Sequence, residues 1–127
     1  KLFVLDVGLL GAMSELPAES ILEGNDIFVE FKGALTEQYV LQQLISDTPY
    51  TPYYYGNEKA TFEQDFLIQK AKSIVPIEVK AEQNIRSHSL KTYCEKFQPE
   101  EAVRFSTLKY KEQERMVNIP LYAVCNL

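Results

Sequence analysis

The sequence contains few of the residues from which zinc sites and disulfide frameworks are built. Its single histidine is His88, and its two cysteines, Cys94 and Cys125, lie far apart without a CxxC or Cys–His spacing. A zinc motif, a histidine-rich metal centre and a disulfide framework are therefore excluded. Because His88 follows Ser87 at an expected helix start, we interpret it as a surface residue rather than a general base.

Long apolar runs and glycine-rich loops are also missing. No segment is long and apolar enough to span a membrane, and no secretion signal precedes Asp6, so we expect a protein of the reducing cytoplasm. Gly33 and Gly56 are isolated, and the motif GxxxxGK(S/T) is not present. A nucleotide-binding loop of that type is therefore excluded.

Positive charge is scarce relative to negative charge. The 13 Lys and Arg residues against 18 Asp and Glu give a formal net charge of -5. This balance argues against strong nonspecific nucleic-acid binding by the chain as a whole, and it leaves open a local basic channel or a site shared with another domain. The length of 127 residues and the hydrophobic content of 46% suit a single domain with one core. Because the chain begins at Lys1 within an expected strand, we expect a domain excised from a longer protein.

The hydrophobic pattern predicts one mixed α/β domain with an N-terminal extension (1–26) and a core (27–127). In the extension we expect a strand over 1–6 and a helix that Pro17 ends. The core elements are expected in the order α-β-β-β-α-β: helix 27–45, strands 50–55, 62–68 and 73–80, helix 87–97 and strand 101–106. The last part is expected to contain a charged loop or hairpin tip (107–115), a short strand (116–119) and a final strand or helix start (120–124).

The apolar, β-branched segment 73–80 is the strand around which the domain is expected to be built. Side chains of a strand alternate between its faces, so Glu78 and Lys80 share one face, roughly 6–7 Å apart at their Cα atoms. Buried charges are costly unless they are paired or bind a metal ion. This pair of charges on a core strand therefore requires an explanation.

Two further carboxylates stand where apolar side chains are expected. In helix 27–45, Glu37 falls on the apolar stripe, whose members are Ala34, Leu41, Leu44 and Ile45. Either its side chain lies inside the fold, or it lies at the edge of the stripe and reaches water. In strand 62–68, Asp65 directly precedes the apolar run 66–68, where aspartate is disfavoured.

Together, these four charged residues indicate a metal-dependent chemistry. Carboxylates that converge on one point bind Mg²⁺, a hard cation that prefers oxygen ligands. A metal ion that bridges a phosphodiester polarises the phosphorus and lowers the pKa of the attacking water. A neighbouring lysine such as Lys80 orients or deprotonates that water and stabilises negative charge on the phosphoryl group.

The order and spacing of these residues resemble the PD-(D/E)XK, or restriction-endonuclease-like, nuclease superfamily. Several segments are also similar to a domain-of-unknown-function family that forms the C-terminal part of bacterial and archaeal AAA-type ATPases: 1–10, 33–37, 63–68, 76–80 and 118–122. The resemblance implies a central mixed sheet flanked by helices, with an extra N-terminal strand and helix and a C-terminal strand. It also implies an N-terminal ATPase module, joined through a winged-helix segment, as the part that binds ATP.

Carried over residue by residue, Asp65 matches the aspartate of the superfamily motif, Glu78 its acidic residue and Lys80 its lysine. Glu37 matches the helix glutamate found in many members, and the resemblance implies the carbonyl oxygen of Val79 as an additional metal ligand. The residue before Asp65 departs from the motif, because it is glutamine instead of proline. The resemblance thus implies Mg²⁺ or Mn²⁺ held by Glu37, Asp65, Glu78 and Val79, and a catalytic set of Glu37, Asp65, Glu78 and Lys80.

These observations give one leading hypothesis and two alternatives. The leading hypothesis is a metal-dependent nuclease that acts on DNA phosphodiesters and is tethered to an ATPase. The first alternative, which the negative net charge favours, is a catalytically inactive module that binds DNA or a protein for the ATPase. The second is an oligomerisation or regulatory domain that uses 50–55 and 121–124 as contact surfaces. We expect the tyrosines at 53–55 to pack within the sheet, with at least one ring buried.

Overall fold

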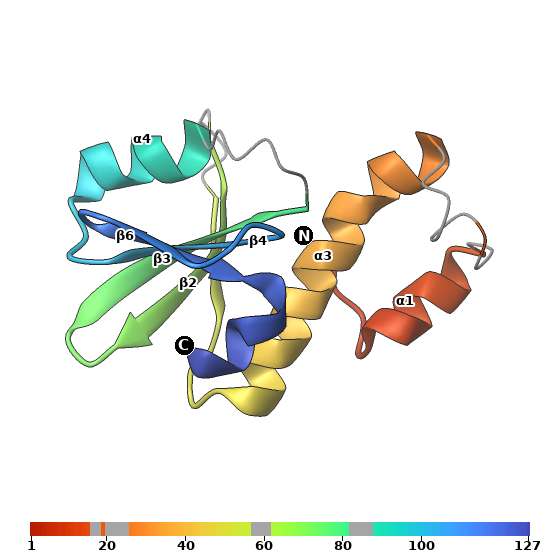
Figure 1. The fold of residues 1–127 in the computed structure, drawn as a ribbon. Coiled ribbons are helices and arrows are strands. Elements are labelled where there is room, and N and C mark those ends of the chain that lie inside the picture. The colour runs from red at the N-terminus through yellow and green to blue at the C-terminus, as the bar shows by residue number, and fades with distance from the viewer. Residues whose placement is uncertain (16–18, 20–25, 57–61, 82–87) are drawn as a thin grey trace.

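A computed structural model describes residues 1–15, 19, 26–56, 62–81 and 88–127 (Figure 1). These residues form a mixed sheet with helices on both faces, which confirms the predicted mixed α/β fold. The helices are α1 (Val7–Met13), α3 (Asp26–Asp47), α4 (His88–Phe97) and the 3-10 helix η1 (Leu121–Asn126). The strands are β1 (Tyr53–Tyr55), β2 (Gln64–Lys70), β3 (Ser73–Lys80), β4 (Ala102–Ser106), β5 (Lys111–Gln113) and β6 (Met116–Pro120). Within these described ranges, no helix combines the length and apolar character needed to cross a membrane.

The strand order across the sheet is β1-β2-β3-β4-β6-β5. Strands β1, β2 and β3 pair as antiparallel neighbours, β3, β4 and β6 run parallel, and β5 pairs antiparallel with β6 at the edge. Helix α4 provides the crossover that connects the parallel strands β3 and β4. Consequently, the C-terminal ends of β3, β4 and β6 and the N-terminal end of β2 lie next to one another, along the edge of the sheet that is formed by strand ends.

The two faces of the sheet have different coverings. On one face, Ile77 of β3 belongs to a fully buried core with Val40 and Leu44 of α3. The opposite face lies under α4 (Figure 1), and Leu90 of this helix lines a pocket together with Arg104 of β4. Because strand side chains alternate between faces and helices cover both faces, β3 and β4 are buried on both sides along most of their length.

The buried face of α3 differs from the predicted stripe. Val40 and Leu44 are completely buried and Leu41 is half-buried, whereas Ala34 is exposed and Ile45 is 63% exposed. The buried face keeps Leu41 and Leu44 of the predicted stripe and adds Val40, so it is rotated toward Val40 and away from Ala34 and Ile45. The prediction is wrong at Ala34 and Ile45. The helix can turn apolar residues toward a neighbour in more than one orientation about its axis, and the position of the sheet determines which orientation is adopted.

The predicted N-terminal strand over 1–6 is wrong. The segment is irregular, and the backbone of Val4 bonds to the side chain of Gln38: the Val4 N–H donates to Oε1, and Nε2 donates to the Val4 carbonyl, both at 2.9 Å. The buried glutamine amide takes the place of a neighbouring strand, so the backbone of Val4 is hydrogen-bonded to α3 and not to a strand of the sheet. The helix that follows is confirmed, and it begins after Asp6, whose side chain accepts from the Leu9 N–H. Pro17, which was expected to end this helix, lies outside the described residues.

Three other elements differ in extent from the prediction. The expected strand 50–55 is reduced to β1, because Pro52 directly before it has no N–H to donate. The charged stretch 107–115 contains the short edge strand β5, which forms a hairpin with β6 and places exposed charged side chains at the sheet edge. Residues 121–124 begin the 3-10 helix η1, which confirms the helix start among the two expected possibilities, and Pro120 ends β6. Of the three tyrosines of β1, Tyr53 and Tyr54 are exposed, whereas Tyr55 is half-buried and packs against the rings of Phe62, Tyr93 and Phe97.

Replacing Gln38 by methionine is expected to release residues 1–6 from α3 and to lower the free energy of unfolding by about 1–3 kcal/mol. Methionine fills a similar volume, but it leaves the Val4 N–H and C=O without their partner. Hydrogen exchange at Val4 and denaturation in urea measure the two effects. The control is Gln43→Met, at a half-buried position of the same helix. Equal effects of the two substitutions would contradict the role assigned to Gln38.

Candidate functional site

The sequence-predicted residues Glu37, Asp65, Glu78 and Lys80 come from three elements that meet at one edge of the sheet. Asp65 lies at the start of β2 and the other strand residues at the end of β3, and these ends adjoin because the strands are antiparallel. Glu37 lies in α3, three residues before Val40, which packs on the sheet. The fold therefore brings together positions that are up to 43 residues apart in the sequence.

The Lys1 ammonium joins the helix and the strand parts of this site. Its Nζ donates to Glu37 Oε2 at 2.9 Å and to Asp65 Oδ1 at 2.7 Å, and both are charge-assisted hydrogen bonds. The same Nζ lies 5.9 Å from the centre of the Tyr54 ring, within the range of a cation–π contact. Two carboxylates from separate elements therefore converge on one positive charge.

Asp65 is also bonded to the neighbouring strand. Its Oδ2 accepts a hydrogen bond of 2.8 Å from the Val79 N–H. This contact places the carboxylate beside the backbone that links Glu78 to Lys80. Because one oxygen bonds to β3 and the other to Lys1, the Asp65 carboxylate has a fixed orientation.

Glu78 is the most deeply buried of the three carboxylates, with 4% of its surface exposed. Its Oε1 lies 2.8 Å from Lys80 Nζ, and its Oε2 accepts from Gln64 Nε2 at 3.3 Å. The same Nε2 donates to the Ile77 carbonyl at 2.7 Å. Gln64 Oε1 is buried and has no hydrogen-bond partner in the part of the chain that the structure describes. The Glu-x-Lys sequence thus forms a partly buried ion pair.

Electrostatic interactions couple the carboxylates. Burial raises the pKa of Glu37, and the negative charges of Asp65 and Glu78 raise it further, while Lys1 acts in the opposite direction. Burial alone would lower the pKa of Lys1, but its bonds to Asp65 and Glu37 outweigh this effect, so the pKa is raised. Glu37 thus lies between the two expected positions, because 25% of its side chain is exposed and its carboxylate is paired with Lys1.

A row of buried polar side chains extends from Glu78 across the parallel strands. Register pairing places Glu78 beside Arg104 of β4 and Arg104 beside Asn118 of β6, and all three are buried. Arg104 Nε donates to Asn118 Oδ1 at 3.2 Å, and Ser106 Oγ donates to the same oxygen at 2.7 Å. Burial lowers the pKa of Arg104, while the charge of Glu78 raises it. The row therefore supplies Glu78 with a second nearby cation besides Lys80.

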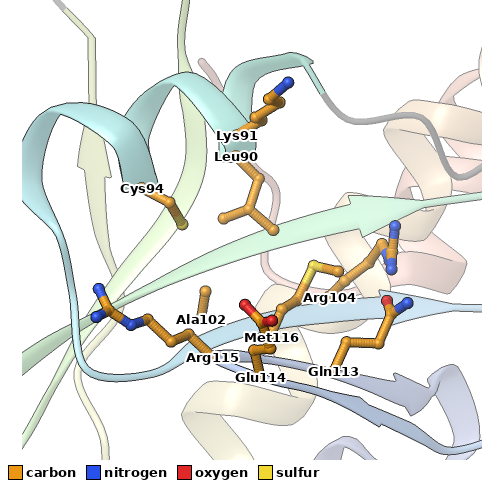
Figure 2. A pocket seen from close by; sticks show the side chains of 9 residues that line it. All are labelled: Leu90, Lys91, Cys94, Ala102, Arg104, Gln113, Glu114, Arg115 and Met116. Atoms are coloured by element: carbon orange, nitrogen blue, oxygen red, sulfur yellow. The ribbon is translucent and has the colours of Figure 1, made fainter.

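A pocket of about 570 Å³ opens beside this row, between α4 and the β5–β6 hairpin. Figure 2 shows Leu90 and Cys94 projecting from α4 toward the sheet, with Arg104 and Met116 across from them. Burial raises the pKa of the Cys94 thiol, which makes this cysteine less reactive than an exposed one. None of the four predicted site residues lines the pocket, so it is separate from the edge at which the carboxylates gather.

The chemistry of the donors at this edge suits a hard divalent cation. Glu37 and Asp65 converge on one positive charge, and Glu78 and the Val79 carbonyl belong to the adjacent strand. The described residues contain no group of three His, Cys, Asp or Glu side chains placed to hold a metal ion. The Lys1 ammonium occupies the position between Glu37 and Asp65. The donor types alone, carboxylate and carbonyl oxygens, are those that Mg²⁺ and Mn²⁺ prefer.

Four residues around the site carry no functional assignment in the sequence analysis: Lys1, Gln64, Arg104 and Asn118. Arg104 and Asn118 could have been found from the sequence, because each is a polar residue inside a strand of otherwise apolar pattern, as Asp65 is. Lys1 could not have been found in this way. A lysine in a surface segment is ordinary, and only folding brings it to partners 36 and 64 positions away.

Comparison with known proteins gives one finding. A family model described as "Domain of unknown function (DUF4143)" matches residues 32–124, a range that contains Glu37, Asp65, Glu78 and Lys80. Its description states no activity. No curated protein and no solved structure matches the chain.

Proposed function

This chain belongs to the DUF4143 family, and we propose that it is a metal-dependent, nuclease-like domain that cleaves DNA phosphodiesters. The observation that carries the proposal is the convergence of Glu37 and Asp65 on one cation. This convergence lies directly beside the ion pair of Glu78 and Lys80. Carboxylates and a lysine in this arrangement are the groups that metal-dependent phosphodiester hydrolysis requires.

The proposed fold is that of the PD-(D/E)XK superfamily. The order α3, β1, β2, β3, α4, β4 supports it, because it follows the α-β-β-β-α-β order of that superfamily. The site residues also occupy the corresponding elements: the first helix, the second strand and the third strand. We propose further that the domain is the C-terminal part of an AAA-type ATPase, and that ATP binds to the N-terminal module of that protein.

In this proposal Glu37, Asp65, Glu78 and the carbonyl oxygen of Val79 hold Mg²⁺ or Mn²⁺. When bound, the metal ion polarises the scissile phosphate and lowers the pKa of a water molecule. The site meets the requirement of oxygen donors, and Asp65 is already oriented by the Val79 N–H. Glu78 is held by Lys80 and Gln64, so its carboxylate is preorganised beside the same edge.

Lys80 is the proposed catalytic cation of the chain itself. Its side chain is 31% exposed, so the ammonium borders both the buried Glu78 and solvent. From this position it is suited to hold a water molecule for attack and to stabilise negative charge on a phosphate that approaches the edge of the sheet. Glu78 keeps the ammonium in place through the 2.8 Å contact.

The test is cleavage of single- and double-stranded DNA by the protein with Mg²⁺ or Mn²⁺. The expected result is cleavage that EDTA stops and that an identically prepared Asp65→Asn variant lacks. Equal cleavage by both proteins would indicate a contaminating nuclease. Absence of cleavage by the parent with either metal ion, alone and with the ATPase module present, would refute the nuclease proposal.

A second candidate is a catalytically inactive module of the same fold that binds DNA or a protein. The contacts of Lys1 favour it, because the ammonium fills the position between the two carboxylates. This candidate predicts no cleavage with any metal ion and DNA binding that persists in Asp65→Asn. Fluorescence anisotropy with labelled duplex and single-stranded DNA separates it from the nuclease.

A further inference from the structure

Resting on the proposed metal site, we propose that Lys1 is an intramolecular competitor for the divalent cation. In this inference the ammonium holds Glu37 and Asp65 together when no metal ion is bound, and it leaves when the metal ion enters. Lys1 therefore sets how much Mg²⁺ or Mn²⁺ the site requires.

The position of Lys1 is specified by several contacts. Its Nζ lies 2.9 Å from Glu37 Oε2 and 2.7 Å from Asp65 Oδ1, and the Tyr54 ring lies on a third side. The segment that carries Lys1 is attached to α3 three residues later, where Val4 exchanges two hydrogen bonds with Gln38. Lys1 therefore reaches the carboxylates from a fixed anchor.

The two cations compete with each other for a simple physical reason. Mg²⁺ binds carboxylate oxygens at about 2.0–2.1 Å, and the oxygens it would meet here are those to which the Lys1 ammonium is bonded. Two positive charges within a few ångströms of each other in a partly buried site repel strongly. The presence of either cation on these two oxygens therefore weakens the binding of the other.

The structure leaves the ammonium a route out of the site. Leu2, the next residue, is 94% exposed, and the Lys1 side chain itself is 23% exposed. The Lys1 side chain can therefore turn into solvent while the anchor at Val4 and Gln38 stays in place. Displacement requires rotation of the lysine side chain and no change in the sheet.

The experiment measures Mn²⁺ binding by isothermal titration calorimetry, with no DNA present. The variants are Lys1→Met, Lys1→Gln, Lys1→Arg and Asp65→Asn, and the matched control is Lys70→Met, which also removes a lysine paired with one carboxylate at 3.3 Å. We expect Lys1→Met and Lys1→Gln to bind Mn²⁺ about tenfold more tightly than the parent, since the competing charge is gone. Lys1→Arg and Lys70→Met should bind as the parent does, and Asp65→Asn should lose binding. Circular dichroism tests whether each variant is folded. If Lys1→Met is not folded, the comparison with the parent is made with Lys1→Gln.

The outcomes separate this inference from the proposed function. If the parent and both Lys1 variants bind Mn²⁺ equally while Asp65→Asn does not, the metal site stands and the competitor role is refuted. Weaker binding by Lys1→Met also refutes it, because Lys1 would then support the site. If no variant binds Mn²⁺, or Asp65→Asn binds it as the parent does, both proposals fail. Binding by Lys1→Met without binding by the parent supports the inference most strongly.

Discussion

Replacing Glu78 by glutamine is expected to lower metal-dependent DNA cleavage by about a thousandfold. Glutamine has the shape of glutamate, so the buried position between β2 and β4 remains filled. The substitution removes the negative charge that the proposed metal ion requires and the carboxylate that places Lys80 Nζ at 2.8 Å. In the proposed function both effects concern the same reaction step, because the metal ion and Lys80 would both stabilise the phosphate under attack. Initial rates on linear duplex DNA at saturating Mn²⁺ measure the loss.

The matched control is Glu101→Gln. Glu101 pairs with Lys70 at 3.3 Å on the surface of the sheet, so this substitution makes the same chemical change away from the site. Its rate should equal that of the parent. A Mn²⁺ titration then distinguishes weak metal binding, which a higher concentration overcomes, from loss of Lys80 positioning, which it does not. A rate of Glu78→Gln within about tenfold of the parent would contradict the assignment of Glu78.

Replacing Arg104 by methionine is expected to lower the free energy of unfolding by about 3 kcal/mol. Arg104 is 4% exposed, lies beside Glu78 in the register of β3 and β4, and donates to Asn118 Oδ1 at 3.2 Å. Removing one member of a buried charge pair leaves the other without compensation, which typically costs about 3–5 kcal/mol. The lower end is expected because Lys80 still pairs with Glu78. Urea denaturation measures the change.

Two comparisons test the origin of this loss. Arg115→Met removes an exposed arginine from the same pocket and should change stability by about 0.5 kcal/mol or less. In a double-mutant cycle, Glu78→Gln should recover part of the stability that Arg104→Met loses, because the carboxylate that needs compensation is gone. Additive effects of Glu78→Gln and Arg104→Met would show that the two charges do not interact. If Arg104→Met is as stable as the parent, the buried row of Glu78, Arg104 and Asn118 does not stabilise the fold as expected.

Local sequence patterns predicted most of the elements but not how they are attached. Strand 73–80 was predicted with its observed ends because a β-branched apolar run has few other conformations. The wrong N-terminal strand has the same kind of apolar pattern, but its backbone partner is the buried amide of Gln38. A sequence pattern states that a segment is extended and apolar, and it does not identify the group that accepts its hydrogen bonds.

The same limit applies to the candidate site. Glu37, Asp65, Glu78 and Lys80 stood out because each is a charged residue in an apolar context, and the structure gathers them from three elements at one edge of the sheet. Arg104 and Asn118 are also polar residues within apolar strand patterns and could be predicted in the same way. Lys1 could not, because its part in the site depends on partners 36 and 64 positions away.

The sequence by itself determined the mixed α/β class, the order of the core elements and the charged residues that interrupt their apolar patterns. These are local properties, which spacing and burial preference express along the chain. Only the tertiary structure decided which face of α3 is buried, that Lys1 lies between Glu37 and Asp65, and that Arg104 lies beside Glu78. These are distances between segments remote in sequence, and they depend on how helices and strands pack around a common core.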